Sequence, residues 1–402
     1  MFLAVLLASA CGGDDTSAPG GGAGGAGSGG EGGTGGTMSN PMDSGIDATS
    51  GSGGSGGVTP TGGRGGGGDG GDGGDADAMV ATDARVDDAS DPDTGVSPTV
   101  QTIAWPSADA VVTVDAMNAF GTDVSGITVD GAFLWMSMNL APTKLYKMEK
   151  SGATWQRVTS DSWDNGKALL FPDGVGVPDA EGVTKAELDS DIIYIGSERN
   201  LQGANASTSR PGVLSYDSSA AGASLTALRE WDLTDALPDV GANLGIEAVT
   251  WIPDTDLDGF YDPAAHPLHG TGVFVVGLES QSDLYFFALS SDGGSALIAT
   301  VATELDGVMG LEYDRSVGYL WAYCDNTCGN RAEILSFASG ELVRRAEVMP
   351  PDSLPNINNE GIAIAPDSEC AGGHKPFYWV EDGNTDGHVL RAGTIPCGAF
   401  LD

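Results

Sequence analysis

Three glutamates in this chain open short stretches of one form, in which the acid is followed by a small residue and then by alternating residue types. Glu360 begins the stretch Glu-Gly-Ile-Ala-Ile-Ala, and Glu181 and Glu247 begin Glu-Gly-Val-Thr and Glu-Ala-Val-Thr. Alternation of this kind predicts a β-strand, and an acid at the mouth of a buried strand is costly unless it is paired or solvated. Carboxylates gathered at one place favour a hard cation that takes oxygen ligands, of which calcium fits best.

The glutamate stretches belong to a repeat that occurs five times. The repeats begin at Ser125, Glu181, Glu247, Met309 and Glu360, and each is followed by a second apolar strand. Third and fourth strands follow in every unit except the last, which has three. Four short strands per repeat at this spacing are typical of a β-propeller blade.

The sequence therefore predicts an all-β fold, a single propeller of four-stranded blades over residues 99–402. Five blades are favoured, with the N-terminal strand 99–105 joining the last blade to close the ring. Six blades are the alternative, because residues 109–117 have no assigned place. A β-sandwich would explain the strands but not the motif that recurs five times.

The propeller geometry predicts where the acids lie. The first strand of each blade runs down the channel from one face, and the second strand returns to that face. The carboxylates that share this channel mouth are then Glu181, Glu247, Glu360, Glu198, Glu279, Asp325 and Asp382. Like charges this close raise one another's pKa unless a cation neutralises them, so we predict Ca²⁺ as the cofactor. The alternative is that each acid only caps a turn or pairs with a nearby arginine.

A separate acidic loop, DTDLDGFYD at residues 254–262, resembles a calcium loop of the EF-hand type. Its acids match four of the ligand positions of such a loop, and they are Asp254, Asp256, Asp258 and Asp262. The final ligand position holds Ala265 where glutamate is expected, and no helices flank the loop. The sequence predicts a structural calcium site on the face opposite the channel mouth, and a solvated acidic turn is the alternative.

Four cysteines lie in the predicted propeller. In an exported domain this number predicts two disulfides. Cys324 and Cys328 fall at the channel-mouth face and Cys370 and Cys397 at the opposite face, so we predict the pairs Cys324–Cys328 and Cys370–Cys397. A zinc site is the weaker alternative, because no histidine lies near the first pair and the second is widely spaced.

Candidate catalytic residues are few. His388 begins the third strand of the last blade and is the histidine expected on the acidic rim, where it could act as a general acid or base. Arg199 is the main basic residue expected on this rim. The alternative for His388 is a hydrogen-bonding surface residue. The chain contains no G-x-S-x-G elbow, Walker loop or H-E-x-x-H motif, so motifs give an enzyme little support.

Three stretches carry a family resemblance: NNEGIAIAPDSEC with the segment after it, VMGLEYDRSVGYLWAYCDNTC, and YDPAAHPLHGTGVFVVGLE. They resemble secreted bacterial propellers of the "esterase-like activity of phytase" and SdiA-regulated families, over roughly residues 120–397. The resemblance implies a propeller with an acidic, calcium-loaded channel mouth and a phosphoesterase role. A full catalytic set of these families does not map onto this chain.

Charge and composition divide the chain and limit its partners. The 402 residues carry 57 acids against 17 lysines and arginines, a formal net charge of −40. A field of this sign repels phosphate backbones and anionic lipids, so we predict no nucleic-acid partner. Residues 11–98 are rich in glycine and aspartate and lack an apolar run that could form a core, which predicts a disordered linker.

The first residues, MFLAVLLASAC, resemble a bacterial lipoprotein signal. The resemblance implies removal of residues 1–10 and lipidation of Cys11, although no basic residue precedes the apolar run and Ala8 stands where the family usually has leucine. We therefore expect a monomer that meets the membrane only through its lipid, at the outer membrane or cell surface. A plain secretory signal, with release of the protein, is the alternative.

Two functions are consistent with these observations. In the first, the protein is a lipid-anchored propeller whose calcium-binding mouth presents a surface to a small-molecule or protein ligand. In the second, it is a calcium-dependent phosphoesterase that uses the same mouth, where the metal activates water. The scarcity of lysine, arginine and histidine favours the binding module.

Overall fold

The computed structural model describes residues 100–108, 110–203 and 208–401, which lie within one compact unit, Ala89–Asp402. The expected signal peptide, the lipidated Cys11 and the linker up to residue 98 lie outside the described residues and stay predictions. No helix in the described ranges is long and apolar enough to cross a membrane.

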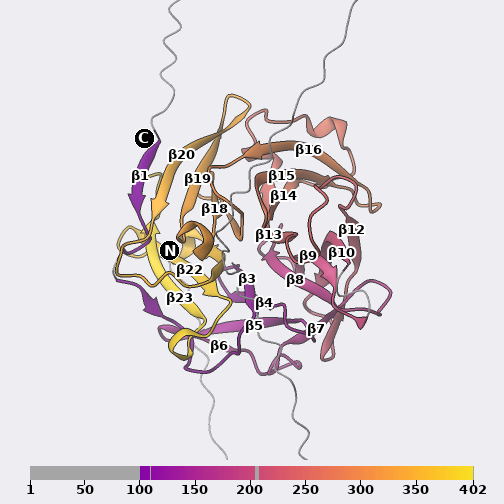
Figure 1. The fold of residues 1–402 in the computed structure, drawn as a ribbon, viewed down its shortest axis with the longest axis horizontal. Coiled ribbons are helices and arrows are strands. Elements are labelled where there is room, and N and C mark those ends of the chain that lie inside the picture. Colours follow the sequence, from indigo (N-terminus) through magenta and orange to yellow (C-terminus); the bar gives the residue numbers. More distant parts are fainter. Residues whose placement is uncertain (1–99, 109, 204–207, 402) are drawn as a thin grey trace, which may run out of the picture. The chain divides into compact units, whose positions relative to one another are not determined.

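Five sheets surround a central axis, and the strands within each blade follow one another in the chain (Figure 1). The first blade contains β3 (Val124–Val129), β4 (Phe133–Met138), β5 (Lys144–Ser151), β6 (Thr154–Arg157) and β7 (Lys167–Leu170). The second contains β8 (Pro178–Thr184), β9 (Ile192–Asn200), β10 (Ser209–Asp217) and β12 (Arg229–Asp232), and β11 (Ser224–Thr226) pairs back onto β7. The third contains β13 (Ile246–Pro253), β14 (Gly272–Leu278), β15 (Gln281–Leu289) and β16 (Ser295–Ala302).

The last two blades complete the ring. The fourth contains β17 (Gly310–Asp314), β18 (Tyr319–Tyr323), β19 (Ala332–Ala338) and β20 (Glu341–Met349), and the fifth contains β21 (Asn359–Ile364), β22 (His374–Glu381) and β23 (Leu390–Pro396). Short 3-10 helices lie in the connections: η2 (Asp254–Asp256), η3 (Pro263–Ala265), η4 (Asn326–Cys328), η5 (Asp367–Glu369) and η6 (Thr385–Gly387). The prediction of an all-β propeller with five four-stranded blades is confirmed, because the segment that suggested a sixth blade belongs to the fifth.

The strand that closes the ring differs from the prediction. The expected closing strand, β1 (Gln101–Ala104), pairs in parallel with β20 of the fourth blade, whereas β2 (Val112–Thr113) pairs with β23 and completes the fifth. The reason lies in Trp105, whose buried ring packs 5.5 Å from Tyr323 and 5.4 Å from Trp379, measured between ring centroids. Trp105 thus holds β1 against the fourth blade, and the outer edge of the fifth blade pairs with β2 instead.

The innermost strands β3, β8, β13, β17 and β21 pack against one another in ring order. Their close approach explains the residue after the acid in the repeat. A Cβ at Gly361 would lie 2.5 Å from the carbonyl oxygen of Ser125, and a Cβ at Gly182 would lie 2.4 Å from the backbone nitrogen of Val249. Glycine at these positions is therefore a packing requirement of a narrow ring.

Both predicted disulfides are present. Cys324 bonds to Cys328 across η4, and Cys370 bonds to Cys397, which ties the segment after β23 to the loop before β22. Because the sulfur atoms of Cys324 and Cys328 are bonded to each other, the structure does not support the zinc alternative.

Replacement of Gly361 by alanine is expected to lower the free energy of unfolding by about 1–3 kcal/mol, because the added methyl group overpacks the ring. Thermal or urea unfolding measures the change. Gly121→Ala is the matched control, since a Cβ at Gly121 would meet nothing within 4 Å. Equal stability of the two variants would contradict the packing explanation.

Candidate metal centre at the channel mouth

One end of the channel opens into a cavity of about 450 Å³. Its lining carboxylates come from all five blades and are Asp123, Asp179, Glu181, Glu198, Glu247, Glu279, Asp325, Glu360 and Asp382. The structure thus brings together the seven acids that the repeat places at one mouth and adds Asp123 and Asp179. Among the described lining residues, Arg199 is the only lysine, arginine or histidine.

A local irregularity in the inner strands aims the glutamates into this cavity. The strand register shifts between Ala180 and Val183, between Ile246 and Ala248, and between Asn359 and Ile362. Each shift lies at the acid and small residue of the repeat. A β-bulge of this kind bends the strand and redirects a side chain, which turns these glutamates toward the mouth.

Glu181, Glu247 and Glu360 form the centre of the site. Each offers a carboxylate oxygen, and these oxygens all lie within 4.8 Å of one another. Glu181 is 2% exposed and Glu247 is 8% exposed. The described structure gives the Glu247 carboxylate no hydrogen bond and no ion pair, although it lines the cavity. A buried carboxylate without a partner requires a cation or a proton.

Neutral amides orient the other two central glutamates, Glu181 and Glu360, and the neighbouring Asp382. Asn139 Nδ2 donates to both carboxylate oxygens of Glu181, at 3.0 and 3.2 Å. Asn358 Nδ2 donates to Glu360 Oε1 at 3.2 Å and to Asp382 Oδ2 at 3.3 Å. These bonds hold the side chains in place but neutralise no charge.

Arg199 serves a second cluster on one side of the cavity. Asp179, Glu181 and Glu198 also bring one oxygen each within 4.8 Å of one another. Arg199 Nε donates to Asp179 Oδ2 at 2.5 Å and lies 3.9 Å from Glu198 Oε1. The guanidinium therefore compensates this side cluster and leaves the central glutamates without a counter-charge.

The pKa values of the central carboxyls reflect this lack of compensation. Burial, with the charges of Asp179, Glu198 and Glu360, raises the pKa of Glu181 well above 4.5. Burial also raises the pKa values of Glu247 and Glu360 well above 4.5, and that of Glu198 to about 8. These shifts favour protons on the carboxyls, and a bound divalent cation would displace those protons.

Below the glutamates the channel narrows. The space between the inner strands there is about 10 Å³, enough for about one water molecule. At the far ends of the strands, the Arg315 guanidinium donates to the carbonyl oxygens of Lys185 at 2.5 Å and of Ala186 at 2.9 Å. It also lies 4.8 Å from the Trp251 ring centroid. Arg315 follows β17 and its partners follow β8, so it spans from one side of β13 to the other.

The acidic loop after β13 does not bring its acids together into one cluster. Each acid has its own partner: Asp254 accepts from Tyr261, Asp256 from Tyr313, Asp258 from Ser339 and Asp262 from Ala264. In the part of the chain that the structure describes, no three of these acids converge as metal ligands. The backbone turns into η2 and η3 there, which spreads the carboxylates apart.

His388 does not line the acidic cavity. Its Nδ1 lies 3.0 Å from Asp115 Oδ1, and the neighbouring Val389 N–H donates to Asp115 Oδ2 at 3.0 Å. Asp115 lies two residues after β2, so this contact holds the closing strand against the fifth blade. The expectation of His388 on the acidic rim is therefore wrong. Arg199 does lie there, but it is bound to Asp179.

The two unpredicted acids differ in how well the sequence marks them. Asp179 stands two residues before Glu181, a spacing that puts both side chains on one side of a strand. That alternation was a usable signal. Asp123 precedes β3, where no glutamate marks the start of the strand, and it reaches the mouth because its N–H donates to the Asp382 carbonyl at 2.6 Å.

Comparison with protein-family models and with curated proteins found no match. Among solved structures, the chain is similar to the major allergen Mala s 1 of Malassezia sympodialis, with a TM-score of 0.36, 12% identity and coverage of 73% of this chain and 83% of that chain. It is also similar to a chain of the mitotic checkpoint complex, with a TM-score of 0.35, 11% identity and coverage of 80% and 98%. These values are too low to carry an argument about function, and the resemblance to the phytase-like and SdiA-regulated families stays a prediction.

Without divalent cations, the free energy of unfolding is expected to fall as the pH rises from 4.5 to about 8. The folded protein keeps protons on these carboxyls over a pH range in which the unfolded chain has already released them. Their contribution to the free energy of unfolding is therefore complete below the pKa of the unfolded chain and is lost as the pH rises toward the pKa of the folded protein. Thermal unfolding in EDTA across this range measures it. Glu181→Gln should flatten the dependence and Glu341→Gln, at an exposed site on β20, should not. A parent protein that gains stability over this range would contradict the expectation.

Proposed function

We propose that this protein is a calcium-binding propeller whose cation-loaded channel mouth binds a ligand. The observation that carries the proposal is the convergence of Glu181, Glu247 and Glu360, with the Glu247 carboxylate buried and without a partner. Acidic clusters that could hold a metal ion are a feature of the structure, and the choice of Ca²⁺ and of a ligand is our inference.

The donor set favours calcium over softer metals. The central site offers only carboxylate oxygens, and the nearby Asn139 and Asn358 add amide groups. Ca²⁺ takes six to eight oxygen ligands in flexible geometry, whereas zinc and copper sites usually include imidazole or thiolate. Three carboxylates would give a bound Ca²⁺ a surplus of negative charge, and open coordination positions would face the cavity.

Ligand binding is favoured over catalysis by the scarcity of cationic side chains in the cavity wall. Among the described residues of the cavity wall there is no histidine or lysine, and the single arginine, Arg199, already compensates Asp179. A phosphoesterase would need cationic groups to stabilise the charge of the transferred phosphoryl group. The phosphoesterase therefore remains the second candidate, in which the metal alone supplies the chemistry.

The double variant Glu181→Gln with Glu360→Gln is expected to weaken Ca²⁺ binding by more than about 100-fold, the upper range for loss of an outer-shell partner alone. Isothermal titration calorimetry of the purified, EDTA-stripped protein measures the affinity. Glu341→Gln is the matched control, because Glu341 is exposed and outside the cavity. Unchanged affinity of the double variant would refute the central site.

The same proteins separate binding from catalysis. Hydrolysis of p-nitrophenyl phosphate or phytate is measured in Ca²⁺ and in EDTA. Calcium-dependent turnover that disappears in the double variant would establish the phosphoesterase and contradict a binding-only role. Calcium binding without turnover supports the binding module.

We also propose that the propeller lies outside the cytoplasm, anchored at the cell envelope through a lipid on Cys11. The two disulfides support an oxidising compartment, since such bonds are rare in reducing ones. The anchor itself rests on the lipoprotein-like sequence before Cys11.

Cys11→Ser is expected to move the protein from the membrane fraction to the soluble fraction of a bacterial host that processes lipoproteins. Cell fractionation with an antibody to the propeller measures the distribution. A parent protein that is already soluble would contradict the anchor.

A further inference from the structure

Glu181 belongs to two carboxylate clusters at the channel mouth. The central cluster adds Glu247 and Glu360 to it. The side cluster adds Asp179 and Glu198 to it. A carboxylate has two oxygens and can serve a different neighbour with each, so one shared glutamate can connect two cation sites. The mouth therefore has the carboxylates for two adjoining cations, each with three acidic side chains around it.

The side cluster already holds a positive charge that comes from the protein itself. Arg199 follows Glu198 on β9, and Asp179 lies on the paired strand β8. Arg199 Nε donates to Asp179 Oδ2 at 2.5 Å and lies 3.9 Å from Glu198 Oε1. The side chains of Asp179 and Glu198 are each 2% exposed, whereas that of Arg199 is 22% exposed. The guanidinium therefore lies against buried carboxylates at the edge of the cavity that it lines.

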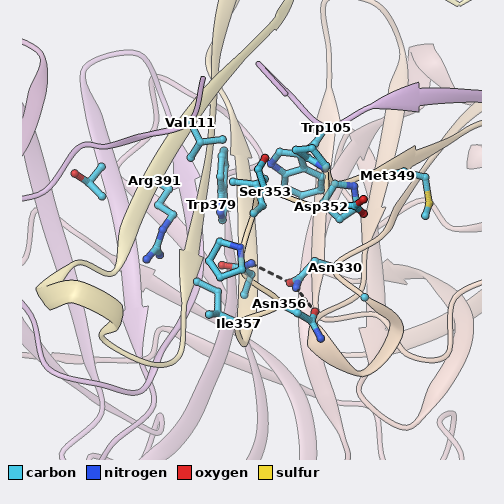
Figure 2. A pocket seen from close by; sticks show the side chains of 17 residues that line it. Trp105, Val111, Asn330, Met349, Asp352, Ser353, Asn356, Ile357, Trp379 and Arg391 are labelled. Atoms are coloured by element: carbon cyan, nitrogen blue, oxygen red, sulfur yellow. Dashed lines mark hydrogen bonds between the residues drawn. The ribbon is translucent and has the colours of Figure 1, made fainter. Parts of the chain in front are cut away.

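A second cavity contains an arginine in a different setting. This cavity of about 520 Å³ lies where the ring closes, and Arg391 is one of its lining residues (Figure 2). Arg391 forms an ion pair with Glu381, whose side chain is 1% exposed. Within the described ranges, Glu381 belongs to no cluster of three side chains that could hold a metal ion. One guanidinium there balances one carboxylate, whereas Arg199 contacts a cluster of three.

A guanidinium is suited to a permanent role as a counter-charge. Arginine stays protonated in proteins, and its N–H donors lie in a fixed plane that matches carboxylate groups. A divalent cation in the side cluster would meet this like charge at close range, which is unfavourable in a buried site. The shared Glu181 still faces the central cluster, where no arginine or lysine is present among the described lining residues other than Arg199.

We propose that Arg199 takes the place of a second cation and limits the channel mouth to one bound Ca²⁺. The inference rests on the proposed calcium site and adds that one side chain sets the number of cations. Two adjoining metal ions can clamp both oxygens of a phosphoryl transfer. Arg199 withholds the second of them, in line with the binding role proposed above.

The test compares the full protein with Arg199→Gln, which removes the charge and keeps a polar side chain. Each protein is stripped with EDTA, dialysed to equilibrium against excess Ca²⁺ at physiological ionic strength, which screens weak binding to surface acids, and analysed for bound calcium by atomic emission. We expect one calcium per parent protein and one more per Arg199→Gln protein, because the side cluster then needs a new counter-charge. Arg199→Gln combined with Asp179→Asn should lose the additional calcium, since only two carboxylates remain in the side cluster.

Arg391→Gln is the matched control. It also removes a largely buried arginine that pairs with a buried glutamate, but it adjoins no cluster of three carboxylates in the described structure. It should bind one calcium, as the parent does. Thermal unfolding with and without Ca²⁺ checks the fold of each variant, and Ca²⁺ should raise the melting temperature of Arg199→Gln by more than that of the parent.

The possible results separate the role of Arg199 from the calcium site itself. A parent protein that binds no calcium contradicts the proposed function and this inference with it. A parent that binds one calcium, with no additional ion in Arg199→Gln, overturns the role of Arg199 alone. A parent that binds two overturns it as well. So does an Arg199→Gln protein that stays unfolded in saturating Ca²⁺, because the cation then does not replace the guanidinium.

Discussion

The close approach of five strand backbones around a narrow axis is the constraint on which the rest of this structure depends. At Gly182 and Gly361 the neighbouring backbone lies where a side chain would begin, so the inner strands can pack only if these positions carry no Cβ. The resulting channel has room for about one water molecule below the mouth. The channel below the mouth is therefore too narrow to hold a ligand larger than water.

At the mouth, the same packing brings together buried carboxylates that need a counter-charge or a proton. The bulges that accompany the acid and small residue turn Glu181, Glu247 and Glu360 toward one another, and burial among the inner strands reduces the hydration of their carboxylates. Neutral amides orient these carboxylates, and Arg199 compensates only the cluster at the side. A divalent cation is the simplest group that satisfies the remaining charge, and this requirement connects the fold with the proposed function.

The five blades and the acidic mouth were predictable from the sequence, because the same residue types recur wherever an inner strand packs against its neighbours. An acid, a small residue and an apolar pair mark the inner strands, and the strand directions then place the seven acids at one mouth. The ring closure was not predictable, because β2 spans two residues and its pairing with β23 depends on Trp105 entering the seam between blades. Asp254, Asp256, Asp258 and Asp262 matched a calcium pattern, but spacing alone does not reveal that tyrosines and backbone amides already engage them.

The narrow channel below the central glutamates has a kinetic consequence for the proposed cation site. If the cation and the ligand both enter the acidic cavity through the mouth, the ligand lies above the cation. A cation seated on the three glutamates can then escape only after the ligand above it has departed. Occupancy would follow a fixed sequence, and the residence time of the metal would be set by the slower exchange of its cover.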